Sequence, residues 1–164
     1  MEDTDFIFKE WSDPVVTEYM RDEEPLATRE QAAEFLRPYQ QPETIPHSKW
    51  WGIERKEDPH LIGTCGYFHW NQPHHRAEIG YDLCPLSWGR GLMPEALQAL
   101  LRYGFKSMDL NRIEAMTHTE NQRSQRVLTK LGFQREGLLR ELHYRDGLYN
   151  DQYQYSLLRR EWQA

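Results

Sequence analysis

The clearest pattern of hydrophobic and polar positions runs through residues 77–105. From Ile79 onward hydrophobic residues alternate with polar ones, a period of two that is typical of a half-buried strand. Pro85 cannot donate a ladder hydrogen bond, so we expect this strand to end at about Cys84. After a loop, Pro94 suits the first turn of a helix. One apolar face with helical spacing follows, formed by Leu97, Leu100, Leu101, Gly104 and Met108.

Alternating runs elsewhere predict further strands, separated by turn residues. These runs cover residues 50–54, 61–70, 112–118, 133–144 and 152–158. The Asp-Gly pair at residues 146–147 is a strong hairpin signal between the last two runs. Helix-start signals occur at residues 12–14 and at Thr28, where Gln31 completes a capping box. Residues 121–133 predict another short helix, closed by a glycine.

The order of these elements predicts an α+β fold with a mixed sheet, because helices come first, then strands, then strand, helix and hairpin. Residues 38–47 hold three prolines without periodicity, which predicts a mobile connection. At 164 residues the chain is long enough for one domain with a sizeable core and too short for two of ordinary size. We therefore expect a single domain over residues 1–164.

Composition and charge exclude several classes of function. No hydrophobic run approaches a membrane span, and MEDTDFIFKE lacks the regions of a signal peptide, which predicts a cytoplasmic protein without a membrane partner. Cys65 and Cys84 suggest neither a disulfide framework nor a zinc site, and His74 and His75 lack metal spacing, so we expect no metal and place these histidines on the surface. The net charge of −6 argues against nucleic-acid binding and mildly favours amine substrates.

The loop between the predicted strand and helix has the sequence Trp-Gly-Arg-Gly-Leu, residues 88–92. Two glycines let the backbone turn tightly, and the bare N–H groups at a helix N-terminus form an anion site. The loop is not a Walker loop, since no Gly-Lys-Ser/Thr follows, and not a dinucleotide fingerprint, since the third glycine is absent. Taken alone, it is equally compatible with an ordinary strand-to-helix turn.

Two segments together resemble a known family. WGRGLMPEAL, residues 88–97, and NQRSQRVLTKLGF, residues 121–133, resemble the acetyl-coenzyme A loop and the following Asn-x-x-Ser helix of the GNAT N-acetyltransferases. The RimJ/RimL branch, which acetylates protein N-termini and small amines, is the most similar. The resemblance extends from about Phe6 to the end of the chain.

This resemblance implies a GNAT fold, with a mixed, mostly antiparallel sheet flanked by helices. Members usually begin with a strand well before the first helix, whereas this chain starts almost at that helix. We therefore expect the usual first strand to be absent or reduced to a stub formed by Phe6, Ile7 and Phe8. An open sheet edge needs to be covered, which favours a homodimer.

The resemblance also implies how the chain would bind acetyl-coenzyme A. The pantetheine arm would lie where the strand ending at Cys84 and the strand over residues 112–118 splay apart after Leu83, and it would bond to unpaired main chain at Leu83 and Cys84. Asn121 would bond the pantetheine or cap its own helix. Lys130 would reach the solvent-exposed end of the cofactor, and its alternative role is that of a solvated helix lysine.

The pyrophosphate of the cofactor would bind the loop and the start of the following helix, with Arg90 assisting. The main-chain N–H groups implied are those of Gly89, Arg90, Gly91, Leu92 and Met93. Family members usually carry Arg or Gln three residues before the first glycine, whereas this chain has Leu86. That replacement removes a polar contact and leaves the amides.

Acetyl transfer to an amine needs a base for the amine and an acid for the thiolate. The resemblance implies Glu78 as the base, on the strand that enters the site, although a solvated strand carboxylate is the alternative. His143 is the second candidate, because RimL-like enzymes carry a glutamate there and histidine titrates in the useful range. Other relatives use a tyrosine as the acid, but Leu128 occupies its place here, so the resemblance implies Ser124 of Asn-x-x-Ser as the acid. The alternative is that Ser124 is an ordinary serine in the first turn of a helix.

These residues predict an acetyl-coenzyme A-dependent N-acetyltransferase whose acceptor is a primary amine, either a protein N-terminus or a small molecule. A coenzyme A-binding regulatory module without catalysis is one alternative, suggested by Leu86 and Leu128 at positions that are polar in the family. A nucleotide-phosphate binder that uses the glycine loop is the other, and the missing Lys-Ser/Thr argues against it.

Overall fold

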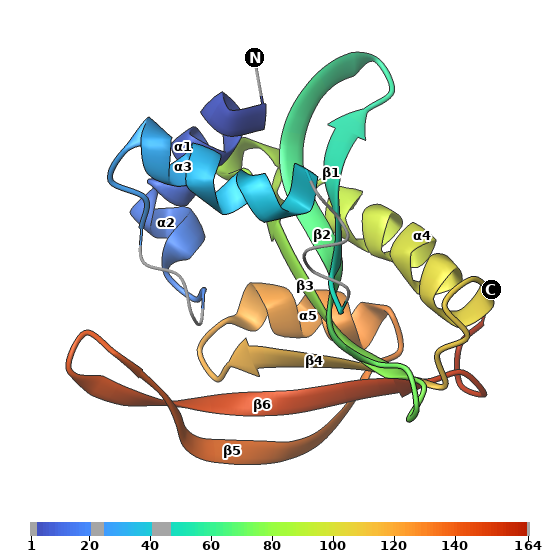
Figure 1. The fold of residues 1–164 in the computed structure, drawn as a ribbon. Coiled ribbons are helices and arrows are strands. Elements are labelled where there is room, and N and C mark those ends of the chain that lie inside the picture. Colours follow the sequence, from blue (N-terminus) through green and yellow to red (C-terminus); the bar gives the residue numbers. More distant parts are fainter. Residues whose placement is uncertain (1–2, 21–24, 41–46, 164) are drawn as a thin grey trace. The chain divides into compact units, whose positions relative to one another are not determined.

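The computed structural model describes residues 3–20, 25–40 and 47–163, and its elements follow the predicted α+β order (Figure 1). In chain order they are α1 (Asp3–Trp11), α2 (Pro14–Thr17), α3 (Arg29–Leu36), η1 (Arg37–Gln40), β1 (Lys49–Arg55), β2 (Asp58–Asn71), β3 (Arg76–Leu83), η3 (Pro85–Ser87), α4 (Leu92–Lys106), β4 (Arg112–His118), α5 (Gln122–Lys130), β5 (Gln134–Arg145) and β6 (Leu148–Leu158).

Six strands form a mixed sheet in the order β1-β2-β3-β4-β6-β5. β3 and β4 pair in parallel, whereas β1 with β2, β4 with β6 and β6 with β5 pair antiparallel. Among the described residues no strand precedes α1. The predicted fold class, a mostly antiparallel mixed sheet with flanking helices, is therefore confirmed.

The chain divides into two compact units. The first consists of Met1–Phe68 and Gly80–Leu92, and the second of His69–Ile79 and Met93–Ala164, so β3 contributes residues to both. A single domain over residues 1–164 remains a prediction.

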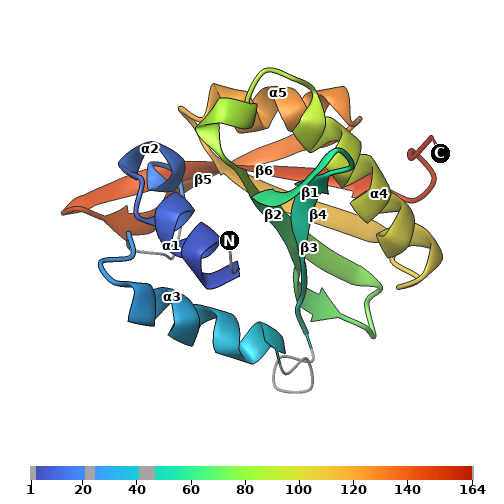
Figure 2. The same cartoon turned by 90° about the horizontal axis from the view of Figure 1, so that it is seen from above.

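In the first unit, α1 takes the place of the predicted strand stub. Phe6 and Ile7 are 5% and 2% exposed and form a core cluster with Trp11 and Ala32. Positions 6, 7 and 11 share one face of a helix but would fall on both faces of a strand, which is why the segment is helical. Of the two predicted alternatives, the stub strand over Phe6, Ile7 and Phe8 is thus wrong, and the usual first strand is absent from the described residues. α1, α2 and α3 lie together in Figure 2.

The predicted helix starts are confirmed. Asp13 caps α2, because its carboxylate accepts a hydrogen bond from the Val15 N–H at 2.8 Å, and Pro14 is the first helical residue. Thr28 and Gln31 form the predicted capping box at the start of α3. Residues 41–46 of the predicted mobile connection lie outside the described residues.

The second unit has its own core, formed by α4, α5 and the strands β4 and β6. Fully buried side chains come from each of these elements or the segments beside them, and they include Leu97, Leu101, Leu110, Ile113, Leu128 and Leu157. Figure 1 shows α5 beside β4. At the hairpin between β5 and β6, Asp146 and Gly147 have φ of 52° and 80°, as expected for a two-residue turn in which both residues are left-handed.

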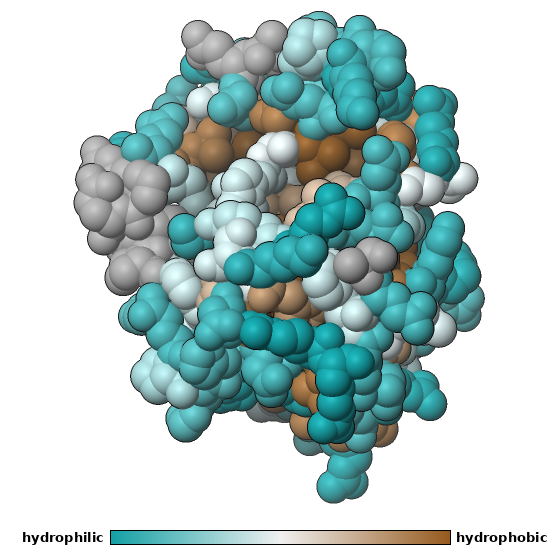
Figure 3. Space-filling view, turned by 90° about the vertical axis from the view of Figure 1, so that its right-hand side faces the viewer, coloured by the Kyte–Doolittle hydropathy of each residue, from teal (hydrophilic) through white to brown (hydrophobic). Residues whose placement is uncertain are grey.

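Strand β5 lies at the edge of the sheet and is exposed along most of its length. Six of the nine exposed large hydrophobic side chains of the described residues belong to the β5–β6 hairpin, namely Leu138, Leu139, Leu142, Tyr144, Leu148 and Tyr149. In the face drawn in Figure 3, hydrophilic side chains surround hydrophobic patches. The hairpin is therefore the most apolar exposed element of the described residues.

Candidate active site

The glycine loop of residues 88–92 follows β3 in the first unit. Gly89 and Gly91 have φ of 73° and 77°, a left-handed conformation that strains L side chains. A Cβ at either position would meet nothing within 4 Å, so the space beside both residues is open. Trp88 holds the loop to the strand end, because its Nε1–H donates to the Leu83 carbonyl at 2.6 Å. This arrangement fits a phosphate group that approaches the backbone.

Helix α4 begins at Leu92, directly after this loop, so its first N–H groups have no partner within the helix. Met93 is 6% exposed, so its side chain is buried. Arg90 and Gly91 are exposed. Glu95 lies in the first turn of α4.

Main-chain groups at the end of β3 are already paired within the first unit. The Cys84 N–H donates to the Ile62 carbonyl at 2.8 Å, and the Cys84 carbonyl accepts from the Ser87 N–H at 2.8 Å. The Leu83 carbonyl accepts from Trp88. The expectation of unpaired main chain at Leu83 and Cys84 is therefore wrong for these three groups, because the short 3₁₀ turn folds back on the strand. Each carbonyl keeps a second lone pair for a ligand.

In the second unit, Asn121 caps α5, because its Oδ1 accepts a hydrogen bond from the Ser124 N–H at 3.0 Å. The capping role predicted for Asn121 is thus confirmed. Gln125 fastens the same turn by donating to the Thr119 carbonyl at 2.9 Å. Ser124 is therefore held in the first turn of a helix whose backbone is fixed at its start.

Lys130 lines a hollow of about 820 Å³ between α5, β5 and β6. Basic and aromatic side chains are among its lining residues, which are Gln122, Gln125, Arg126, Thr129, Lys130, Phe133, Arg135 and Tyr155. Whether Lys130 also reaches a cofactor stays a prediction.

Glu78 lies on β3 and is 5% exposed, so its alternative reading as a solvated carboxylate is wrong. The parallel ladder with β4 runs only from Arg76 with Arg112 to Glu78 with Glu114, although both strands continue. The described ladder thus ends at Glu78, not after Leu83 as expected. β4 goes on pairing with β6 as far as His118, so its pairing on that side does not depend on β3.

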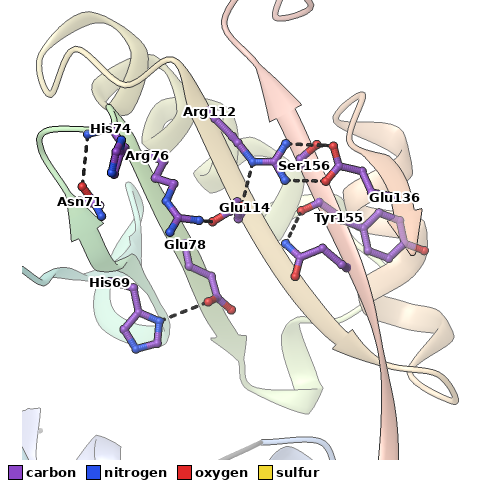
Figure 4. A network of polar contacts seen from close by, with 11 residues as sticks. His69, Asn71, His74, Arg76, Glu78, Arg112, Glu114, Glu136, Tyr155 and Ser156 are labelled. Carbon is purple, nitrogen blue, oxygen red and sulfur yellow. Dashed lines mark hydrogen bonds and ion pairs between the residues drawn. The ribbon is translucent and has the colours of Figure 1, made fainter. Parts of the chain in front are cut away.

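Figure 4 shows the polar network around Glu78. The Nδ1 of His69 lies 3.4 Å from Glu78 Oε2. Arg76 donates to the neighbouring Glu114 at 3.3 Å, and Arg112 donates to Glu114 at 2.8 Å. These two arginines thus balance the charge of Glu114, which pairs with Glu78 across the ladder.

Arg112 also binds Glu136, with an Nη1 to Oε1 distance of 2.9 Å. This pairing, helped by a hydrogen bond from Ser156, lowers the pKa of Glu136 to about 2, and the same carboxylate raises the pKa of Arg112. Both groups are therefore charged at neutral pH, and they tie β4 to β5 and β6.

His143 lies on β5 opposite Asn150 of β6. In the strand order, β4 and β6 stand between β5 and the strand that carries Glu78. The two candidate bases therefore come from separate strands. They are alternatives in the sequence but are not neighbours in the sheet.

A buried carboxyl pair in the first unit was not anticipated from the sequence. Glu10 of α1 is 5% exposed and Asp82 of β3 is 9% exposed. Glu10 Oε2 and Asp82 Oδ1 have no hydrogen-bond partner among the described residues, although Thr64 donates to Asp82. Burial, and then the charge of Asp82, raises the pKa of Glu10 to about 7, and burial raises that of Asp82 to about 6. The period-two pattern placed Asp82 on a polar face and so concealed it.

The described residues contain no group of three His, Cys, Asp or Glu side chains able to hold a metal ion. No described helix is long and apolar enough to cross a membrane.

Known proteins resemble this chain in sequence and in fold. The sequence model of the family described as Acetyltransferase (GNAT) domain matches residues 1–134. An uncharacterized N-acetyltransferase, p20 of Bacillus licheniformis, is 42% identical over 99% of this chain and 90% of its own length. The chain belongs to the GNAT acetyltransferase family. It is accordingly an N-acetyltransferase, and enzymes of this family use acetyl-coenzyme A.

More distant similarities reach proteins with defined substrates. The [ribosomal protein uS5]-alanine N-acetyltransferase of Escherichia coli is 29% identical over 69% of this GNAT chain and 59% of its own length. The spermidine N-acetyltransferase of Vibrio cholerae, solved with CoA and spermine, has a TM-score of 0.85 at 23% identity and covers 97% of this chain and 91% of its own. At that identity the likeness concerns the fold alone.

Proposed function

We propose that this enzyme transfers the acetyl group of acetyl-coenzyme A to a primary amine, as a RimJ/RimL-like member of its family. The acceptor is a protein N-terminal amine or a small amine. The proposal rests above all on Glu78, a buried carboxylate located where the described β3–β4 ladder ends. A carboxylate at such a position can take a proton from an amine held beside the strand.

The glycine loop would hold the pyrophosphate of acetyl-coenzyme A, which supplies the activated acetyl thioester. The N–H groups of Gly89, Arg90, Gly91, Leu92 and Met93 are the donors, and the start of α4 adds a favourable helix dipole. The carbonyls of Leu83 and Cys84 would accept from the amides of the pantetheine arm. Asn121 and Lys130 would complete the binding residues.

Glu78 acts in this proposal as the general base that accepts the amine proton, and Ser124 as the acid that holds a proton for the leaving sulfur. His143 is the alternative base. Ser124 suits its role because Asn121 fixes the first turn of α5. The rate contribution of a positioned acid or base is typically on the order of 10²- to 10⁴-fold.

We also propose that the enzyme is a single-domain homodimer. A strand stub at Phe6 does not support the dimer, because that segment is a buried helix. The dimer is supported by the exposed apolar hairpin β5–β6 at the edge of the sheet, with Leu138 and Leu142 on β5 and Leu148 on β6. An apolar edge strand needs covering, and a second copy would cover it symmetrically.

A thiol-release assay tests the function directly. The protein is mixed with acetyl-coenzyme A and a panel of N-terminal peptides, polyamines and aminoglycosides, and free coenzyme A is measured. We expect acceptor-dependent release with at least one class. Tight binding of acetyl-coenzyme A without release for any acceptor would instead indicate a regulatory module.

A further inference from the structure

His69 and Glu78 form a contact that joins a buried carboxylate to solvent. They lie on β2 and β3, the two strands of one hairpin, with the Nδ1 of His69 3.4 Å from Glu78 Oε2. The Glu78 side chain is 6% exposed, whereas that of His69 is 76% exposed. Figure 4 shows the imidazole directed at the carboxylate. A contact of this length can tighten once a substrate is bound.

The backbone at His69 is strained. Its φ is 51°, in the left-handed region, although the residue lies inside strand β2. A non-glycine residue adopts this conformation only rarely, and such residues concentrate at functional sites. Glu141 also has a positive φ inside a strand, β5, where the pairing with β6 is irregular, whereas His75 and Asp146 lie in turns and Asp109 in the loop before β4. At His69 the left-handed backbone coincides with the contact to Glu78.

The two arginines nearest Glu78 in the network are engaged by other carboxylates. Arg76 of the same strand donates to Glu114, and Arg112 of β4 donates to Glu114 and Glu136. His69 contacts Glu78, and its side chain also faces solvent.

A buried base must lose its proton before the next turnover. We propose that His69 carries the proton of the acceptor amine from Glu78 to bulk water. The inference rests on the proposed role of Glu78 as base. His69 is in this sense a positioning residue, because it acts on the reaction through Glu78.

The transfer moves one proton and changes only O–H and N–H bonds. The amine N–H proton passes to a Glu78 oxygen, and Glu78 Oε2–H then donates it to the Nδ1 of His69. That step leaves the Glu78 carboxylate ionised again. The imidazolium then releases its Nε2–H proton to water. The ring is left as the Nδ1–H tautomer and exchanges back through solvent, which its exposure allows.

The test is chemical rescue of His69→Gly. Glycine adopts the left-handed backbone without strain and leaves room for a free imidazole. We expect kcat to fall by up to about 10²-fold, with the KM for acetyl-coenzyme A and the thermal shift on adding it unchanged. Added imidazole should restore kcat in a saturable way and should leave the wild-type rate unaltered. His69→Asn, which also tolerates a left-handed backbone, should lose rate and respond less to imidazole.

His75→Gly is the matched control. His75 has φ of 48° and its Nδ1 lies 3.3 Å from Asp109 Oδ2, so it is a second left-handed histidine beside a carboxylate, but here the carboxylate is exposed. We expect the wild-type kcat for this variant, with or without imidazole.

The outcomes separate this inference from the proposed function. If the wild type releases coenzyme A but Glu78→Gln keeps its rate, Glu78 is not the base and the proposed mechanism fails. If Glu78→Gln is slow while His69→Gly is fast, the proton leaves Glu78 by another route and the relay is overturned. A slow His69→Gly without response to imidazole also overturns it. Rescue of His69→Gly but not of Glu78→Gln supports it.

Discussion

At the scale of single residues, burial decides which carboxyl groups of this enzyme can carry chemistry. Glu78 is 5% exposed, whereas Glu114, its partner across the β3–β4 ladder, is held by two arginines. Glu114 is thus engaged by two guanidinium groups, whereas the buried Glu78 carboxylate contacts the exposed imidazole of His69.

The first prediction concerns Glu78→Gln, which keeps the shape of the side chain and removes its basicity. We expect kcat to fall by roughly 10²-fold or more, with nearly unchanged affinity for acetyl-coenzyme A. Steady-state kinetics and cofactor titration measure both quantities. Glu120→Gln, at an exposed position after β4, serves as the control and should keep the wild-type rate.

His143→Ala distinguishes the alternative base. If His143→Ala abolishes turnover and Glu78→Gln does not, the base lies on β5 rather than β3. A histidine base would also give an acid limb of the pH–rate profile, since an unperturbed imidazole titrates near pH about 6.5. Wild-type rates in both variants would mean that the amine arrives deprotonated and that proximity alone carries the reaction.

The second prediction concerns Ser124→Ala. Without the hydroxyl, the leaving sulfur would depend on water for its proton, so kcat should fall while α5 stays capped by Asn121. Single-turnover measurements compare the chemical step in the variant and the wild type. Thr129→Ala, on an exposed turn of the same helix, is the matched control. An unchanged chemical step in Ser124→Ala would exclude the serine as the acid.

The third prediction concerns Glu10, whose pKa is raised from 4.5 to about 7 by burial and by Asp82. Because the folded state holds this proton more tightly than the unfolded state, stability is fully present below pH about 4.5 and is lost as pH rises to about 7. Asp82, raised to about 6, adds to the same loss. Glu10→Gln should therefore flatten the decline and raise stability at pH 8, by at most about 3 kcal/mol at about 1.4 kcal/mol per unit.

Urea unfolding between pH 4 and pH 8 measures this effect. Glu34→Gln, at an exposed position of α3, is the control and should follow the wild-type curve. A Glu10→Gln curve parallel to that of the wild type would mean that the carboxyl is solvated in the native protein.

At the scale of elements, strand β3, the glycine loop of residues 88–92 and helix α4 together form the segment that would bind the cofactor. The fourth prediction is that acetyl-coenzyme A stabilises the protein through this loop, by roughly 2.7 kcal/mol at about 100 times its Kd. Gly91→Asp adds strain at φ of 77° and a negative charge beside the pyrophosphate, so the thermal shift on adding cofactor should shrink sharply.

Gly147→Asp controls for the backbone effect. Gly147 has φ of 80° and open surroundings, as Gly91 has, but it lies in the β5–β6 turn. We expect this variant to lose some stability and to keep the full shift with acetyl-coenzyme A. Equal shifts in both variants and the wild type would remove the loop from the binding site.

At the scale of the whole molecule, the fifth prediction is that the protein is a dimer that covers the β5–β6 hairpin. Light scattering at micromolar concentration should give about twice the chain mass of 19.7 kDa. Leu142→Asp should reduce that mass, because it places a charge on the apolar edge. Leu86→Asp, on a still more exposed leucine outside the hairpin, should not. A monomeric wild type would refute the prediction.

The sequence by itself determined the elements whose signals are local. Alternation, capping residues and turn residues depend on neighbours a few positions apart, so β4, the Thr28 capping box and the Asp-Gly hairpin were predictable. The motif pair around Gly89 and Asn121 likewise indicated the family.

Only the tertiary structure decided properties that depend on distant parts of the chain. The spacing of Phe6, Ile7 and Trp11 suits a helix, but their burial depends on packing with Ala32, which lies 26 positions after Phe6. Asp82 follows a polar alternation but is buried because α1 brings Glu10 near it. His69 meets Glu78 because one hairpin folds back on itself. Burial and proton partners are set by three-dimensional packing, which periodicity along a single strand or helix does not specify.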